Sequence, residues 1–284
     1  MTQILHFNDI LLKTGLHLDD VRLLRHQEYG PRGQTPYSLW VESPDKLRRY
    51  QEVQRTDRRP RFAAPFWASF VVQPDGKTMF VGIFAASLRG PANAGYLHPF
   101  DEKPLPAGEI GKVDQYDCLL TDHIRDLIGR LIIEWGPGTR SWVQRADSDA
   151  GRNKPIAEIR ERFSEPHFPG YKKFISTLSG LANLPMGWRT ALSSVSGIYL
   201  LTCPRTKEQY VGQAFGEAGF WGRWLSYVAT GHGGNVGLKS RDLSDYQVSI
   251  LEICGSDTTK GDLDFRESLW KRKLQSREMG LNRN

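Results

Sequence analysis

The sequence predicts an α+β protein built from two folded parts. Two observations point to this class: β-prone apolar runs flank turn residues at 65–90 and 196–212, and helical apolar spacing occurs at 222–229 and 264–278. A third is the stretch 166–192, where prolines interrupt the pattern. We therefore expect an N-terminal domain over residues 1–165, a linker with a helix over 166–192, and a C-terminal domain over 193–284.

Composition narrows the class of protein. The chain has 284 residues, 39% of them hydrophobic and 25% charged, which is ordinary for a soluble globular protein. It has no apolar run of about 18 residues, so we expect no membrane span. The first residues lack a secretion signal, and the three widely spaced cysteines predict neither a disulfide framework nor a zinc site. We expect a cytoplasmic protein, and the net charge of +6 favours a polyanionic partner.

The N-terminal residues 4–28 read as helical. Asn8-Asp9 and Asp19-Asp20 are each suited to cap a helix, and apolar residues follow both pairs. In the second segment Arg22, Arg25 and His26 fall on one side. That side is either a solvated helix face or a face that contacts phosphates.

Residues 42–61 form the most basic stretch of the chain. A helix is expected through Lys46–Gln54, ending near Pro60. The arginines that follow it are candidates for nucleic-acid binding, namely Arg55, Arg58, Arg59 and Arg61. The alternative is a solvated helix and linker, because charge runs usually face water.

The rest of the N-terminal part reads as a curled, largely antiparallel sheet. A hairpin is expected over 65–90, a loop over 91–108, a helix over 122–131, a second hairpin from 130–135 and 141–145, and a strand over 156–159. Four tryptophans are candidates for its core rather than for base stacking, namely Trp40, Trp67, Trp135 and Trp142. One fold compatible with such a sheet is the PUA-like barrel, which holds modified bases.

The C-terminal part continues from the linker with short alternating elements. Residues 171–181 predict a helix in the linker. After the 196–212 hairpin we expect a helix at 222–229, a Gly-rich loop, a helix at 237–242, a third strand at 246–252, and a helix at 264–278 capped by Asp262 or Asp264.

One stretch carries a recognisable motif. Gly197-Ile198-Tyr199 is followed by Tyr210-Val211-Gly212, and the two tyrosines can share one face of an antiparallel pair. Further on come an arginine in Gly222-Arg223-Trp224, a glutamate in the segment 265–270, and an asparagine in Gly280-Leu281-Asn282. In this order and spacing, residues 193–284 resemble the GIY-YIG nuclease family. The resemblance implies a three-stranded antiparallel sheet flanked by helices.

The resemblance also implies roles for particular side chains. Glu267 would bind the metal, Mg²⁺ or Mn²⁺, since one carboxylate with waters and a phosphate suits a hard cation. Arg223 would hold phosphate oxygens. Tyr199 would act as general base or position the water, although a free phenol has a pKa near 10, and Tyr210 would shape the site. Each role has a structural alternative: a helix-dipole carboxylate, an Arg–Trp contact, and core tyrosines.

Several positions support the site or depart from the family pattern. Gly197 and Gly212 belong to the motif, and Asn282 reads as a structural hydrogen-bonding residue. Many members carry a histidine four residues after the arginine, where this chain has Tyr227 as a candidate phosphate donor or proton relay. The Gly-rich loop offers His232, and Lys239 is a candidate phosphate contact; both can equally be solvated loop residues.

Together these features predict a metal-dependent endonuclease that hydrolyses DNA, expected to be double-stranded, with the N-terminal domain selecting the target. Restriction of foreign DNA is a plausible setting; repair and mobile-element roles stay open. One domain has one active site, so cutting both strands needs a homodimer or two encounters. The alternative is a nucleic-acid-binding protein that does not cut, and a weaker one is a first domain that binds a protein partner.

Overall fold

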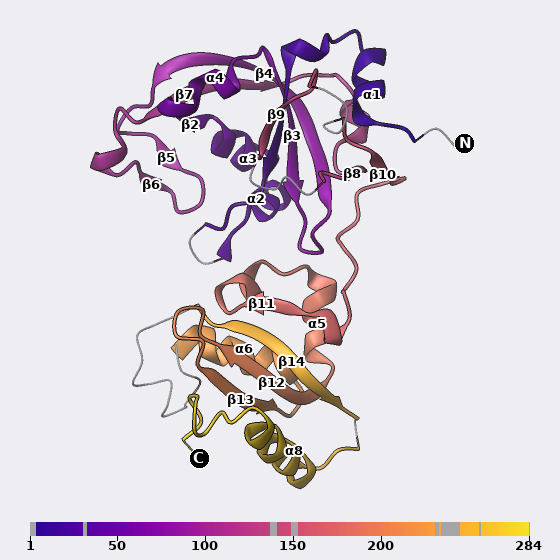
Figure 1. The fold of residues 1–284 in the computed structure, drawn as a ribbon, viewed down its shortest axis with the longest axis vertical. Coiled ribbons are helices and arrows are strands. Elements are labelled where there is room, and N and C mark those ends of the chain that lie inside the picture. The colour runs from indigo at the N-terminus through magenta and orange to yellow at the C-terminus, as the bar shows by residue number, and fades with distance from the viewer. Residues whose placement is uncertain are drawn as a thin grey trace. The chain divides into compact units, whose positions relative to one another are not determined.

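The computed structural model divides the chain into two compact units, Met1–Pro166 and His167–Asn284 (Figure 1). It describes residues 4–30, 33–136, 141–148, 153–230, 233, 245–255 and 257–283. Helices occur with several β-sheets, one of them curled, as the α+β class requires. None of the helices within these described residues is long and apolar enough to span a bilayer.

The first unit is organised by an eight-stranded, mostly antiparallel sheet. Its order is β10-β8-β4-β3-β1-β9, and β7 pairs with both β4 and β2. The strands are β1 (Val21–His26), β2 (Val53–Arg55), β3 (Phe66–Val72), β4 (Thr78–Pro91), β7 (Val113–Leu120), β8 (Leu131–Ile133), β9 (Val143–Arg145) and β10 (Ile156–Ile159). The helices are α1 (Phe7–Lys13), α2 (Pro36–Glu42), α3 (Pro44–Gln51) and α4 (Arg59–Phe62), and β5 (Leu97–His98) pairs with β6 (Lys103–Pro104).

The helix expected over residues 4–28 is correct only for α1. Residues 21–26 form β1, which is parallel to β3 and antiparallel to β9. All six residues are buried, because the strand has neighbours on both edges and packed layers on both faces. Arg22, Arg25 and His26 are therefore interior side chains, and neither the solvated nor the phosphate-contacting helix face exists.

The predicted β3–β4 hairpin is present with its turn at residues 73–77, and β10 lies at the predicted strand. The second predicted hairpin is wrong, because β8 pairs with β4 and β10 whereas β9 pairs with β1. In place of the helix expected over 122–131 there is a 3-10 turn at Arg125–Leu127, and Leu131 already begins β8. The turn residues between β8 and β9 suggested that these two strands pair with each other, but each pairs with strands that are distant in sequence.

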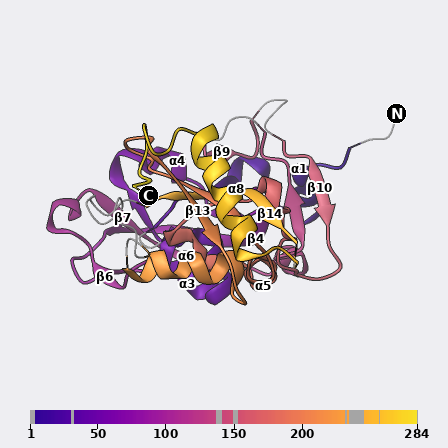
Figure 2. The same ribbon diagram turned by 90° about the horizontal axis from the view of Figure 1, so that it is seen from below.

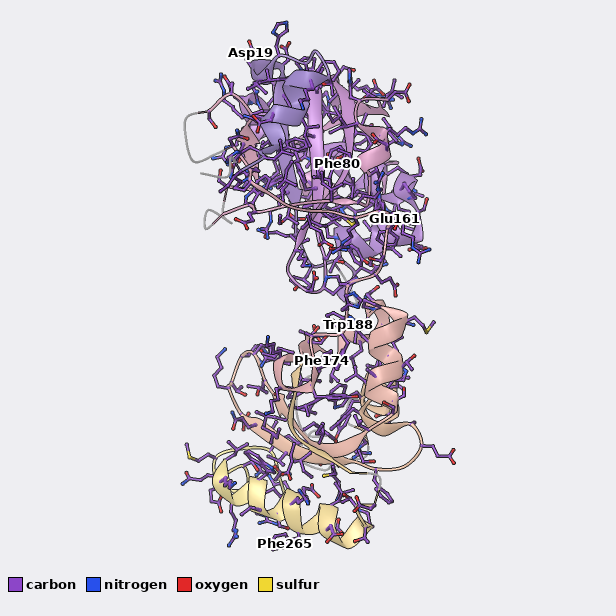
Figure 3. All side chains as sticks on the ribbon, turned by 90° about the vertical axis from the view of Figure 1, so that its right-hand side faces the viewer. Asp19, Phe80, Glu161, Phe174, Trp188 and Phe265 are labelled. Carbon is purple, nitrogen blue, oxygen red and sulfur yellow. The ribbon has the colours of Figure 1, made fainter. Side chains whose placement is uncertain are left out.

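The core of the first unit is rich in aromatic side chains. Trp67 is fully buried and Trp135 nearly so; Trp142 is partly buried against the Trp67 cluster, and Trp40 is partly buried against a separate cluster around Tyr37 and Leu47. Phe80 lies in the interior, in tilted contact with the rings of Phe7 and Phe70 (Figure 3). The tryptophans therefore serve the core, as predicted.

The second unit contains a four-stranded antiparallel sheet in the order β11-β14-β12-β13. Its strands are β11 (Ile175–Thr177), β12 (Ser196–Thr202), β13 (Gln209–Ala214) and β14 (Gln247–Cys254), and its helices are α5 (Met186–Ser193), α6 (Gly219–Thr230) and α8 (Lys260–Lys273). The expected hairpin, third strand and flanking helices are all found. The 237–242 helix lies outside the described residues.

The stretch 167–192 is part of this unit rather than a separate linker. The expected helix at 171–181 is replaced by 3-10 turns and by β11, which adds a fourth strand to the predicted three. Phe174 and Trp188 point into the core of the unit (Figure 3). The helical spacing misled because these apolar residues are buried by packing on β14, α5 and α6, not along one helix face.

The two faces of the sheet carry different helices. On one face α6 and α5 cover Tyr199, Leu201 and Tyr210. On the other, α8 lies across the strands and packs Leu263 against Ile198 (Figure 2). The cap expected at Asp262 or Asp264 is instead Thr259, whose side chain accepts from the N–H of Asp262, so α8 begins at Lys260.

Candidate active site

The motif hairpin places both tyrosines on one face of the sheet. In the β12–β13 register Tyr199 lies opposite Gly212, and Leu201 lies opposite Tyr210. Cross-strand partners share a face, so the two phenols are diagonal neighbours under α6. Both are buried, at 0% and 5% exposure.

The motif glycines allow close approach. A Cβ on Gly212 would lie 2.4 Å from the Tyr199 hydroxyl oxygen, so the phenol extends over β13 because no side chain blocks it. A Cβ on Gly197 would lie 2.1 Å from the carbonyl oxygen of Glu252 on β14. Gly212 therefore lets Tyr199 extend toward the outer edge of the sheet, since β13 is an edge strand.

Helix α6 brings two further groups to the phenols. The Tyr227 hydroxyl lies 2.8 Å from that of Tyr199, and it also hydrogen-bonds Tyr210. Arg223, one turn earlier, donates from Nε to the Tyr199 oxygen at 3.2 Å. Its guanidinium carbon lies 5.1 Å from the Tyr227 ring centre. The structure thus joins three hydroxyls and one guanidinium in a continuous cluster.

Burial sets the protonation of this cluster. Desolvation raises the pKa of Tyr199, Tyr210 and Tyr227 above the ordinary value for a phenol. Burial acts to lower the pKa of Arg223, but the oxygens of Tyr199 and Tyr227 raise it beyond its usual value. At neutral pH the three phenols are therefore neutral hydroxyls, and Arg223 is a cation.

Glu267 belongs to α8 and reaches the edge strand from the opposite face. Its Oε2 accepts from the Gln213 amide at 2.7 Å, and Lys271 Nζ lies 3.1 Å from Oε1. Both members of this ion pair are buried, at 9% and 3% exposure. The same Gln213 nitrogen donates to Asp264 at 2.7 Å, so two carboxylates converge on one amide.

The charge of the Glu267 carboxylate contributes to the raised pKa of Tyr210, so the carboxylate lies within electrostatic reach of the hydroxyl cluster. Gly212 and Gln213, adjacent on β13, connect the two groups: one accommodates Tyr199 and the other holds Glu267. No set of three or more acidic, histidine or cysteine ligands occurs within the described residues. Glu267, with Asp264 next to it, still fits Mg²⁺ or Mn²⁺, because such ions retain waters and need one or two carboxylates.

Asn282 has the structural environment expected of it. Its side-chain oxygen accepts from the N–H of Val211 at 2.9 Å, and its amide donates to the carbonyl of Val211 at 2.8 Å. Ser276 donates to the same oxygen at 2.7 Å. The buried side chain therefore replaces a neighbouring strand along the outer edge of β13 and fixes the segment between Tyr210 and Gly212.

The candidate DNA-binding arginines of the first unit divide into two kinds. Arg59 makes a two-pronged contact with the buried Asp114 at 2.9 and 2.7 Å, and Arg55 pairs with Asp57 and Glu109. Arg58 and Arg61 are exposed, and no ion pair joins them to a carboxylate within the described residues. Arg59 therefore anchors α4 to β7, whereas the charges of Arg58 and Arg61 are available to contact phosphates.

Two predicted residues, His232 and Lys239, lie outside the described residues. Three residues around the candidate metal ligand were missed as site residues in the sequence: Gln213 and Lys271, which contact Glu267, and Asp264, which shares the Gln213 amide with it. The four-residue spacing from Glu267 to Lys271 on one helix was a usable signal for the ion pair. No such signal marked Gln213 in the sequence, because its contact with Glu267 depends on the distance between β13 and α8.

Comparison of the chain with protein-family models, curated proteins and solved structures gives no match.

Proposed function

We propose that the chain is a metal-dependent DNA endonuclease of the GIY-YIG type, with its active site along the β13 edge of the second unit and target selection by the first unit. The observation that supports this best is the convergence of Tyr199, Tyr210, Arg223 and Tyr227, with Glu267 beside them. These residues come from three separate segments. Core packing alone does not require a cation among buried hydroxyls.

In this proposal each side chain has a distinct task. Arg223 neutralises charge on the phosphate, which the planar guanidinium does well. Because the pKa of Tyr199 is raised, the phenol accepts a proton from the attacking water only while passing its own to Tyr227, 2.8 Å away, and Tyr227 in turn passes its own proton along its hydrogen bond to Tyr210 and from there to solvent. The water oxygen then bonds to phosphorus, the P–O3′ bond breaks, and O3′ takes a proton from solvent, leaving a 5′-phosphate and a 3′-hydroxyl, as in the family.

Glu267 would hold the metal ion, and Gln213 would orient that carboxylate. The bound ion supplies charge stabilisation at the phosphate. The proposed setting is restriction of foreign DNA, with repair or mobile-element roles as alternatives, in a cytoplasmic protein that acts on double-stranded DNA.

The test is nicking of supercoiled plasmid with Mg²⁺ or Mn²⁺. Wild type should nick, and Glu267→Gln should lose at least about 100-fold of the rate, as is usual for loss of a group that stabilises developing charge. Both substitutions remove the charge that pairs with Lys271, but the glutamine amide oxygen can still accept from the ammonium, so Glu267→Ala is the poorer variant and costs about 3–5 kcal/mol of stability. Equal nicking by wild type and Glu267→Gln would refute the assignment.

A second candidate, a DNA-binding protein that does not cut, is favoured by the Glu267–Lys271 ion pair. The ammonium occupies a carboxylate oxygen that a metal would need. DNA binding without cleavage by wild type in either metal would select this candidate.

The exposed arginines provide a separate test of DNA binding. Arg58→Ala with Arg61→Ala should weaken binding and reduce the slope of log affinity against log salt by about 2, one unit for each lost phosphate contact. Arg59→Ala should act through stability instead, because it strips Asp114 of its partner. An unchanged salt slope in the double variant removes Arg58 and Arg61 from the interface.

A further inference from the structure

The first unit contains a buried cation, Arg25, that pairs with no carboxylate among the described residues. Arg25, on β1, is 7% exposed and donates from Nε to the Thr78 hydroxyl at 3.0 Å and from Nη1 to the Gln27 carbonyl oxygen. In the described part of the chain no ion pair joins it to a carboxylate, and its desolvation lowers its pKa. Its neighbour on the same strand, Arg22, is satisfied differently, by the main-chain carbonyls of Asp19 and Ala63.

Arg25 lines an open cavity of about 590 Å³ within the first unit. Its buried lining includes Arg25, Thr78 and Trp135, and the guanidinium carbon lies 6.0 Å from the Trp135 ring centre. Arg22 does not line this cavity. A buried charge held only by neutral groups is costly, so a ligand that brings acceptors to the guanidinium would offset that cost.

The rim of the cavity selects the kind of ligand. Three carboxylates line it, the exposed Asp75 and Glu134 and the half-buried Glu158, together with Lys77, which pairs with Glu158 at 3.3 Å. A phosphate would be repelled by those carboxylates at the entrance. A neutral ring with acceptors on one edge and N–H groups on another could accept from the guanidinium of Arg25 on the floor and donate to the carboxylates at the rim. Guanine has this pattern, and an arginine fork matches its O6 and N7.

We propose that this cavity binds an unpaired guanine base, with Arg25 donating to O6 and N7 and the rim carboxylates accepting from N1–H and the 2-amino group. That the base belongs to DNA rests on the proposed function. Such a contact would let the first unit select a guanine that is extruded or bulged from the duplex.

The experiment measures binding of the full chain in EDTA, where no cleavage occurs. Fluorescence anisotropy compares duplexes that carry a single bulged guanine, 7-deazaguanine or adenine. Wild type should bind the guanine bulge about tenfold more tightly than the other two, which is the usual value of one two-pronged base contact. Arg25→Gln should abolish this preference, and the matched variant Arg22→Gln should keep it.

Equal affinity of wild type for the three bulges would overturn the proposal, and so would a guanine preference that survives in Arg25→Gln. The 7-deazaguanine duplex changes only the ligand, so the result holds even where Arg25→Gln folds poorly. Displacement of the DNA by micromolar guanosine would identify a free nucleoside as the ligand and overturn the assignment to DNA. Nicking is measured on the same preparation, so a wild-type protein that nicks but shows no preference among the three bulges refutes this site alone.

Discussion

The buried Lys271–Glu267 pair makes a sharp prediction about metal affinity. At 3.1 Å and an effective dielectric constant of 20, the Coulomb attraction between the two charges is about 5 kcal/mol. A metal ion on Glu267 must compete with this attraction. Even if desolvation and relaxation cancel three quarters of it, the remaining ~1.4 kcal/mol corresponds to a factor of ten in affinity. Lys271→Met keeps most of the side-chain volume and removes the competing charge.

Lys271→Met should therefore bind Mn²⁺ at least about tenfold more tightly than wild type, measured by calorimetric titration without DNA. The half-saturating Mn²⁺ concentration for nicking should fall in parallel. Lys273→Met is the matched control, because Lys273 lies near the same end of α8 over the Trp270 ring, 4.7 Å from its centre. Unchanged or weaker Mn²⁺ binding by a folded Lys271→Met protein would show that Glu267 is not the metal ligand.

Three further predictions concern named contacts. Asn282→Ala should cost about 3 kcal/mol in urea unfolding, because it leaves the buried N–H and C=O of Val211 unpaired; a loss below 1 kcal/mol would contradict the edge-strand role. Tyr227→Phe should slow plasmid nicking by about 100-fold with unchanged circular dichroism, and a wild-type rate would exclude the relay from Tyr199. Burial lowers the pKa of His26 from 6.5 to about 4. Between pH 4 and pH 6.5 the unfolded state therefore carries a proton on this histidine that the folded state lacks. The free energy of unfolding should then fall by about 3 kcal/mol as pH drops from 7 to 4, and His26→Gln, compared by urea unfolding across this range, should lack that part of the decrease.

Sequence reasoning worked where the local pattern and the final environment agree. The β3–β4 and β12–β13 hairpins have turn residues between β-prone runs, and their partners are adjacent in the chain. It failed at β1, where Arg22 and Arg25 resemble the polar side of an amphipathic helix. Both arginines are interior only because β3 and β9, from distant parts of the chain, flank the strand.

The candidate site likewise consists of residues that the sequence predicted and residues that it did not predict. The motif indicated Tyr199, Tyr210 and Arg223, and the four-residue spacing on α6 indicated Tyr227. The pairings of Gln213 with Asp264 and Glu267 depend on how closely α8 packs against β13, which no local pattern encodes. The roles assigned to all of these residues stay predictions until nicking is measured.

The two edges and the two faces of strand β13 each make a different contact, so we expect the motif segment to tolerate little change. Its inner edge pairs with β12, and its outer edge is covered by Asn282 at Val211 rather than by another strand. One face must lack a side chain at Gly212 to admit Tyr199, while the next residue, Gln213, points to the other face and holds Glu267. A shift of the register by one residue would exchange these faces. It would move Gly212 out from under Tyr199 and separate Gln213 from both carboxylates, so the asparagine that fixes the register is as necessary to the site as the groups it contains.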